Sequence, residues 1–356
     1  MTDTLEVAGA TRSLNPPRAL AYSPALDGIR AVAILLVMLF HARVPGFEAG
    51  FVGVDVFFVL SGYLITTILL AERERSGAIQ WRRFVLRRIF RLAPALAALC
   101  LGMLVLSAWT WPSTVSPWLE VALAMTYLSD LTVSPLNVPQ ALGHSWSLSV
   151  EEHFYLVWPA ALLMLPRGRP QSVALAILGL YLLASVWRVG LLVDGTAWRE
   201  VYFRLDTRLS GLMFGGLLSA LVWAGVPGWL PGRVILVLSV VGAAVVLATG
   251  EWRDPHMLVV GVPVIEIATA GVILACLSGR GLLRALLSSG VMVWLGKLSY
   301  GLYLWHYPIF RILRDQADWP VVLAIGLPLT LGLAWTSHVT VERWGLALRE
   351  RLFPGV

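Results

Sequence analysis

An all-α, polytopic integral membrane protein is the fold that this 356-residue sequence predicts. Its residues are 58% hydrophobic and 13% charged, and its mean hydropathy is +0.77. Soluble domains contain about 25% charged residues, so this chain has too few charges for a water-exposed surface. It also divides into about ten apolar runs of membrane-spanning length, with most of its arginines between them.

Polar or charged segments mark the ends of the first five runs. Crossing a hydrocarbon core of ~30 Å takes about 20 mostly apolar residues. The break VPGFEAGF separates the first two runs, and the basic segment WRRFVLRRIFRLAP precedes the third. The predicted spans are 26–42, 52–70, 92–111, 148–165 and 171–191.

Segments rich in Pro, Gly and charged residues, such as GEWRDPH and RDQADWP, separate the second five runs. A further apolar segment, PWLEVALAMTYL at 117–128, is too short to cross the membrane. We expect it to lie in the interface or to re-enter the membrane. The predicted spans of this half are 206–224, 233–250, 257–277, 289–311 and 320–341.

The distribution of arginine predicts the orientation. With ten spans and a cytoplasmic N-terminus, 17 of the 27 Lys and Arg residues fall in inside segments and six in outside loops. Cytoplasmic loops carry an excess of Lys and Arg, so both termini are expected in the cytoplasm. The predicted organisation is a polar cytoplasmic tail (1–25), a transmembrane domain (26–341) and a short cytoplasmic tail (342–356).

Several classes of protein are disfavoured by the composition. The net charge of +6 does not indicate nucleic-acid binding, because no basic patch with interleaved aromatic residues occurs. Only two cysteines occur, Cys100 and Cys276, each inside an apolar run, so neither a disulfide framework nor a metal site is expected. The motifs of soluble hydrolases, NTPases and zinc enzymes are not found.

The first predicted span contains two catalytic candidates, Arg30 and His41. At about 100° and 1.5 Å per residue, both lie on one helix face, roughly 16 Å apart along the axis. A neutral imidazole can take a proton from a hydroxyl or carry an acyl group as a nucleophile. The alternative for His41 is an interfacial residue that ends the helix, but ionisable groups within a span favour a functional role.

Arg87, Arg88 and Arg91 form an RRxxR motif just before the third predicted span. Arg88 and Arg91 share a helix face at i, i+3 spacing, so together they can hold a phosphate group. The alternative is that a basic cluster beside a span only anchors the topology. The motif is therefore a candidate site for a phosphorylated ligand.

Glu151 and Glu152 begin the fourth predicted span. In a catalytic role, one carboxylate orients His41 or acts on an acceptor hydroxyl. In a structural role, both stabilise the positive end of the helix dipole. Other polar side chains in or near the apolar runs are candidates for substrate binding or for structure, namely Asp55, Ser147, Tyr155, Arg208, Tyr300 and His306.

Taken together, these motifs resemble the membrane-bound acyltransferase family 3, the integral-membrane O-acyltransferases of bacterial glycan modification. The resemblance extends from residue 26 to about 309 and follows the order of the family's motifs. It rests on LDGIRAVAILLVMLFH, GFVGVDVFFVLSGYLI, FVLRRIFRLAPA, SWSLSVEEHFYLVWP, RLDTRLSGLMFGGLLSA and LGKLSYGLYLWHYPI.

The resemblance implies an acyl-coenzyme A donor used from the cytoplasm, an acceptor hydroxyl on the outer side, and residence in the bacterial plasma membrane. The family's Arg-x10-His pattern falls on Arg30 and His41, and its arginine motif, linked to the coenzyme A phosphates, falls on Arg88 and Arg91. His153 stands where the family usually has glutamine, a change that could alter acceptor preference. Many members also carry an extracytoplasmic hydrolase-like domain, and we expect this protein to act without one in the same chain.

The sequence therefore predicts a membrane O-acyltransferase, most simply an acetyltransferase, without a metal cofactor. The expected acceptor is a cell-surface glycan, a glycolipid or a glycosylated metabolite, reached directly or through a separate extracytoplasmic transferase. Membrane lipid and acyl-CoA are the other expected partners. Direct transfer and an acyl-histidine intermediate remain open, and the alternative function is a transporter that exports a small acid or a lipid-linked glycan.

Overall fold

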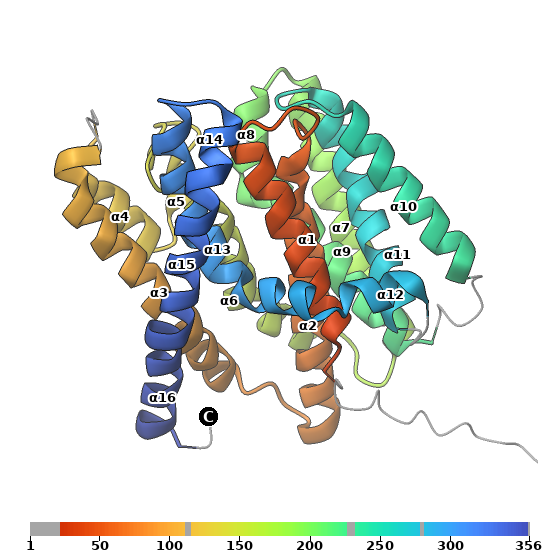
Figure 1. Cartoon of the computed structure of the whole chain (residues 1–356). Helices are drawn as coiled ribbons and strands as arrows, with labels where there is room; N and C mark the ends of the chain where they lie inside the picture. Colours follow the sequence, from red (N-terminus) through yellow and green to blue (C-terminus); the bar gives the residue numbers. More distant parts are fainter. Residues whose placement is uncertain (1–21, 111–114, 226–231, 278–280, 355–356) are drawn as a thin grey trace, which may run out of the picture.

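A computed structural model describes residues 22–110, 115–225, 232–277 and 281–354. Within these ranges the chain is helical and contains no strand, which confirms the predicted all-α class. Most of the long helices run roughly parallel or antiparallel in one bundle (Figure 1). The start of α1 and the end of α2 lie at the lower end of the bundle in this view, together with the C-terminal α16.

Each of the ten predicted spans coincides with a helix or a run of consecutive helices. The long helices are α1 (Pro24–His41), α2 (Gly53–Ser76), α3 (Trp81–Thr110), α6 (Ser145–Met164), α7 (Pro170–Val193), α9 (Leu205–Trp223), α10 (Gly232–Thr249), α11 (Val262–Leu277) and α13 (Gly290–Arg314). The last run comprises α14 (Trp319–Val321), η4 (Val322–Gly326), α15 (Leu327–Ser337), η5 (His338–Glu342) and α16 (Arg343–Leu352). Shorter elements are η1 (Gly50–Val52), α4 (Pro117–Met125), α5 (Ser129–Thr132), α8 (Trp198–Phe203), η3 (Met257–Gly261) and α12 (Leu282–Leu287).

Seven helical segments in the described ranges are long and apolar enough to cross a membrane. The helices α6, α10 and α13 match predicted spans but are not among these seven, and α13 carries Lys297, Arg311 and Arg314. The chain is thus a multi-pass membrane protein. The count of ten spans and the cytoplasmic position of both termini stay predictions.

Two helix boundaries differ from those predicted. The third helix begins at Trp81, so the basic segment before residue 92 is helical and extends α3. The predicted tail 342–356 likewise contains α16, whose last turn carries Arg349 and Arg351. Hydropathy identifies the part of a helix that suits hydrocarbon, whereas Arg and Leu are good helix formers that continue the helix into a polar environment.

Glycines allow the central helices to approach closely. A Cβ atom at Gly62 of α2 would lie 1.9 Å from the carbonyl oxygen of Leu212 in α9, and one at Gly215 would lie 2.0 Å from that of Val59. Small residues at helix crossings permit such backbone contact in membrane proteins. This contact fixes α2 against α9 and so positions the inward face of α2.

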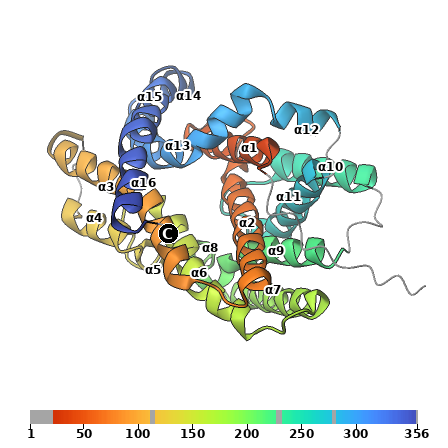
Figure 2. The ribbon, with the colours of Figure 1, turned by 90° about the horizontal axis from the view of Figure 1, so that it is seen from below.

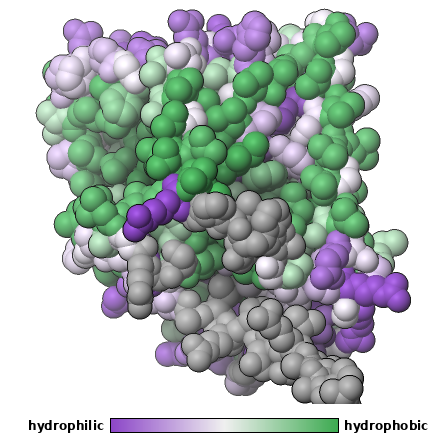
Figure 3. Space-filling model, turned by 90° about the vertical axis from the view of Figure 1, so that its right-hand side faces the viewer, coloured by the Kyte–Doolittle hydropathy of each residue, from purple (hydrophilic) through white to green (hydrophobic). Residues whose placement is uncertain are grey.

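Apolar side chains fill the interior and also cover the outside of the bundle. In Figure 3, hydrophobic residues cover much of the face formed around α10 and α11, below a hydrophilic upper edge. An apolar outer face is what lipid contact requires. Both cysteines, Cys100 and Cys276, are free and buried, as expected for core thiols.

Candidate functional site

A cavity of about 900 Å³ opens between the helices that carry the sequence motifs. Its lining comes from α1, α2, α3, α6 and α13, from Tyr127 in the turn after α4, and from the C-terminal segment around η5 and α16. Seen from below, these elements surround the middle of one half of the bundle (Figure 2). The volume of the cavity lies at the upper end of the range of about 300–1,000 Å³ that is typical of ligand sites.

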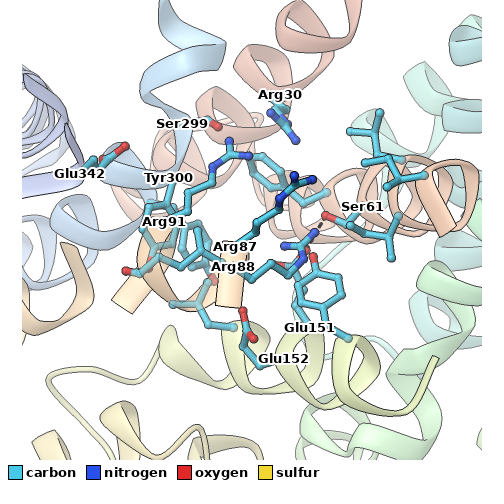
Figure 4. A pocket seen from close by; sticks show the side chains of 18 of the residues that line it. Arg30, Ser61, Arg87, Arg88, Arg91, Glu151, Glu152, Ser299, Tyr300 and Glu342 are labelled. Atoms are coloured by element: carbon cyan, nitrogen blue, oxygen red, sulfur yellow. Dashed lines mark hydrogen bonds between the residues drawn. The ribbon is translucent and has the colours of Figure 1, made fainter. Parts of the chain in front are cut away.

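The cavity lining is strongly basic. Nine Lys and Arg side chains line it, against five Asp and Glu. Figure 4 draws Arg30 of α1 and three arginines of α3 around one common space. A concave surface with this excess of positive charge attracts an anionic ligand. The basic residues are Arg30, Arg75, Arg83, Arg87, Arg88, Arg91, Lys297, Arg343 and Arg349.

The arginines of α3 are not neutralised by the carboxylates nearby. In the described residues, no ion pair within 4.0 Å joins Arg87, Arg88 or Arg91 to an Asp or Glu. The guanidinium of Arg88 instead lies 3.5 Å from the ring centre of Tyr155, and Phe84 is 5.5 Å away. A stacked guanidinium keeps its edge donors available, so it is suited to a phosphate.

Two carboxylates of α6 face the arginines across the cavity. Glu151 accepts a hydrogen bond of 2.6 Å from Ser61 of α2, and Glu152 lies nearby on the same wall (Figure 4). One turn earlier, Ser147 and Tyr303 are joined by a hydrogen bond of 2.5 Å. Ser147 and Tyr303 line the cavity at the end of α6 that is farther from the arginines.

His41 lies outside the cavity lining, at the other end of α1 from Arg30. Its Nδ1 atom is 3.1 Å from Nε2 of His306 in α13. The sequence suggested that Glu151 or Glu152 orients His41, but among the described residues the side chain within hydrogen-bond distance of its ring is that of His306. Arg30, by contrast, lines the cavity and lies 3.5 Å from Asp27.

His144, just before α6, lies beside His41 and His306 and completes a cluster of three histidines. The sequence analysis named the other two but missed His144. Its ring stacks on Tyr307 with centroids 4.8 Å apart and lies 5.9 Å from the ring of His306. It is 3% exposed, and within the described residues neither ring nitrogen has a hydrogen-bond partner. The only signal in the sequence was its position directly before the SWSLSVEE motif.

Asp55 and Arg208 form a buried ion pair that does not face the cavity. Arg208 Nη2 lies 2.7 Å from Asp55 Oδ1, and both side chains are 1% exposed. Next to them, Arg188 donates to the Ser210 hydroxyl, which in turn donates to Glu266. This network ties α2, α7, α9 and α11 together, which favours the structural role for Asp55 and Arg208 over substrate binding.

Some of the remaining predicted residues line the cavity and others lie outside its lining. Tyr155 and Tyr300 line the cavity, and the Tyr300 hydroxyl donates to the carbonyl oxygen of Leu92 at 2.8 Å. His153 lies 3.3 Å from Asp130 and is not part of the lining. In the part of the chain that the structure describes, no group of three or more His, Cys, Asp or Glu residues could hold a metal ion.

Comparisons with known proteins show the family to which this chain belongs. The acyltransferase domain model matches residues 23–339. Peptidoglycan O-acetyltransferase OatA of Listeria monocytogenes is 33% identical over 82% of this chain and 50% of its own length, and O-acetyltransferase OatA of Staphylococcus aureus is 31% identical over 90% and 57%. The chain thus spans about half the length of these curated relatives. No solved structure matches it significantly.

Proposed function

This chain belongs to the acyltransferase domain family, and from that premise we propose that it is a membrane O-acetyltransferase. Its donor is acetyl-CoA taken from the cytoplasm, and its acceptor is a hydroxyl group of a cell-envelope glycan in the bacterial plasma membrane. Because one relative is named a peptidoglycan O-acetyltransferase, peptidoglycan is the first acceptor to test. A transporter, the alternative that the sequence left open, does not agree with membership of an acyltransferase family.

The observation that carries the proposal is the arginine-lined cavity between α1, α3 and α6. Coenzyme A carries a diphosphate and a 3′-phosphate, and Arg side chains bind phosphate oxygens in paired hydrogen bonds. In this proposal Arg87, Arg88 and Arg91 bind the phosphates. The pantetheine arm then extends along the cavity, so that the thioester lies toward Ser147 and Tyr303.

His41 acts as the general base in the proposed reaction. It removes the proton of the acceptor hydroxyl, whose oxygen attacks the thioester carbonyl carbon. The C–S bond then breaks, the acetyl group stays on the acceptor oxygen, and the coenzyme A thiolate leaves and takes up a proton. A positioned base contributes about 10²–10⁴-fold to such a reaction.

Arg30 and the two carboxylates have supporting roles in this proposal. Arg30 stabilises negative charge on the donor within the low-dielectric cavity. Glu151 and Glu152 position the donor or the acceptor hydroxyl at the opposite wall. The space in which the pantetheine arm lies is shaped by Ser147, Tyr155 and Tyr300.

We favour direct transfer over an acyl-histidine intermediate, because direct transfer needs only the proton transfer that a neutral imidazole performs.

The test is transfer of labelled acetyl groups from acetyl-CoA to purified peptidoglycan by the full chain in proteoliposomes. We expect wild type to label the glycan and His41→Ala to lower kcat about 10²–10⁴-fold at equal protein levels. The matched control is His256→Ala, because this histidine is exposed and its ring nitrogen pairs with the neighbouring Asp254. Full activity of His41→Ala would remove the proposed base, and no transfer from acetyl-CoA to any glycan would refute the function.

A further inference from the structure

His306 is buried beneath the catalytic candidate and makes two directed contacts. Its Nδ1 atom lies 3.0 Å from the carbonyl oxygen of Leu302, one helical turn earlier. Its Nε2 atom lies 3.1 Å from His41 Nδ1. The side chain of His306 is 0% exposed, so water cannot replace either partner.

These contacts determine where the protons lie. A carbonyl oxygen only accepts hydrogen bonds, so Nδ1 of His306 must carry a proton to bond Leu302. A neutral imidazole has one N–H, which leaves Nε2 of His306 as an acceptor. His41 must therefore donate through Nδ1, and its unshared electron pair lies on Nε2. The opposite assignment would place two lone pairs against each other at Leu302 and lose a buried hydrogen bond, at a cost of about 1–3 kcal/mol.

We propose that His306 is a positioning residue that holds His41 as the Nδ1–H tautomer and keeps Nε2 free to accept the proton of the acceptor hydroxyl. This inference rests on the proposed function, since it gives His41 the role of base. The arrangement follows the logic of a catalytic triad, in which a third group fixes the tautomer of the histidine. Here a neutral imidazole, itself fixed by a backbone carbonyl, takes the place of the usual carboxylate.

Two neighbouring groups, Arg314 and Tyr307, hold the pair in place. Arg314 donates to the backbone carbonyl of His41 at 3.3 Å and so fixes the end of α1 against α13. The ring of Tyr307 meets His41 edge-on, with centroids 5.0 Å apart. Aromatic packing alone would be satisfied by Phe at position 306. The N–N contact of 3.1 Å is what calls for an imidazole there.

Nitrogen NMR of the full chain in lipid bilayers reads the tautomer directly. With ¹⁵N-labelled histidine at alkaline pH, each of the six neutral imidazoles reports which nitrogen is protonated. The His41 signals are assigned by their loss in His41→Ala. We expect His41 to be protonated at Nδ1, although free imidazole side chains favour Nε2–H. A His41 signal protonated at Nε2 would overturn the proposal, whatever the activity of the protein.

Two substitutions then test whether His306 is the cause. His306→Leu removes the acceptor, whereas His306→Gln offers its Oε1 near the position of the lost Nε2. We expect His306→Leu to lower the Nδ1–H fraction of His41 and to lower kcat about 10–100-fold with little change in the KM for acetyl-CoA. His306→Gln should restore the tautomer and most of the kcat, and His256→Leu is the matched control.

The outcomes separate the inference from the function beneath it. An unchanged tautomer in a folded His306→Leu would assign control to the carbonyl of Val37, which also hydrogen-bonds His41, and would overturn the role of His306. If His306→Leu does not fold, His306→Gln alone decides, because loss of the Nδ1–H tautomer there contradicts the proposal. A correct tautomer in an inactive wild type would instead refute the proposed function.

Discussion

Two regions of this molecule contain arginine and carboxylate side chains, and they use them in opposite ways. Around α2, α7, α9 and α11, Arg208 is paired with Asp55 at 2.7 Å and both are excluded from solvent. In the cavity, nine basic side chains face five acidic ones, and Arg88 stacks on Tyr155 rather than pairing with a carboxylate. The buried ion pair of Asp55 and Arg208 holds helices together, whereas the cavity arginines that have no counter-ion are suited to binding an anionic ligand.

The largest effect is expected in the buried network. Asp55→Ala leaves Arg208 buried without its partner, and breaking such a pair lowers the free energy of unfolding by about 3–5 kcal/mol. Denaturant unfolding in detergent micelles measures this. Asp194→Ala, an exposed aspartate, should change stability by less than about 0.5 kcal/mol. Equal stability of the two variants would remove the distinction between the regions.

Removing a cavity arginine should give the reverse pattern. Arg88→Ala deletes a charged donor to the ligand, an interaction of about 1.5–3 kcal/mol, so the KM for acetyl-CoA should rise roughly 10–100-fold. Its stability should fall by only about 0.5–1 kcal/mol, because the stacking on Tyr155 is lost but no described carboxylate pairs with Arg88. A large loss of stability without a change in KM would make Arg88 structural.

Arg88→Lys keeps the charge but loses the planar fork and the stacking on Tyr155. We therefore expect a smaller rise in KM, about 3–10-fold, in the steady-state assay with acetyl-CoA. A KM as high as that of Arg88→Ala would show that geometry, rather than charge, governs binding. Wild-type behaviour would mean that a point charge is sufficient and that the stacked geometry is irrelevant.

The smallest effect is that of salt. Cavity charges open to solvent are screened, so raising the KCl concentration should increase the KM for acetyl-CoA a few-fold, about 2–5-fold. The buried pair of Asp55 and Arg208 is shielded from ions, so the stability difference between wild type and Asp55→Ala should not change with salt. A salt-independent KM would argue against electrostatic recognition of the donor.

Much of the fold was predictable because spans are set by local composition. Hydropathy found ten helical regions, and helical spacing placed Arg88 and Arg91 on one face, where both line the cavity. The start of α3 at Trp81 was missed because the basic segment is helical without being apolar. Local sequence patterns identify helices and the residues that share a helix face. They do not show which other helix that face packs against.

Contacts between distant segments could not be read from one sequence. His41 and His306 are 265 residues apart, and only the packing of α1 on α13 brings them together. Asp55 and Arg208 are 153 residues apart, so neither revealed that the other neutralises it. A single sequence shows which side chains are costly to bury. It does not show which of them are paired, and that distinction separates the structural charges from the candidate site.

The most direct test of this account is equilibrium binding of coenzyme A to the full chain in lipid nanodiscs by calorimetry. Wild type is compared with Arg88→Ala and with Arg82→Ala, an arginine of the same helix that does not line the cavity. We predict that Arg88→Ala weakens binding at least about tenfold, whereas Arg82→Ala stays within about twofold. Equal affinities for both variants, or no binding by wild type, would contradict the assignment of the cavity to the donor.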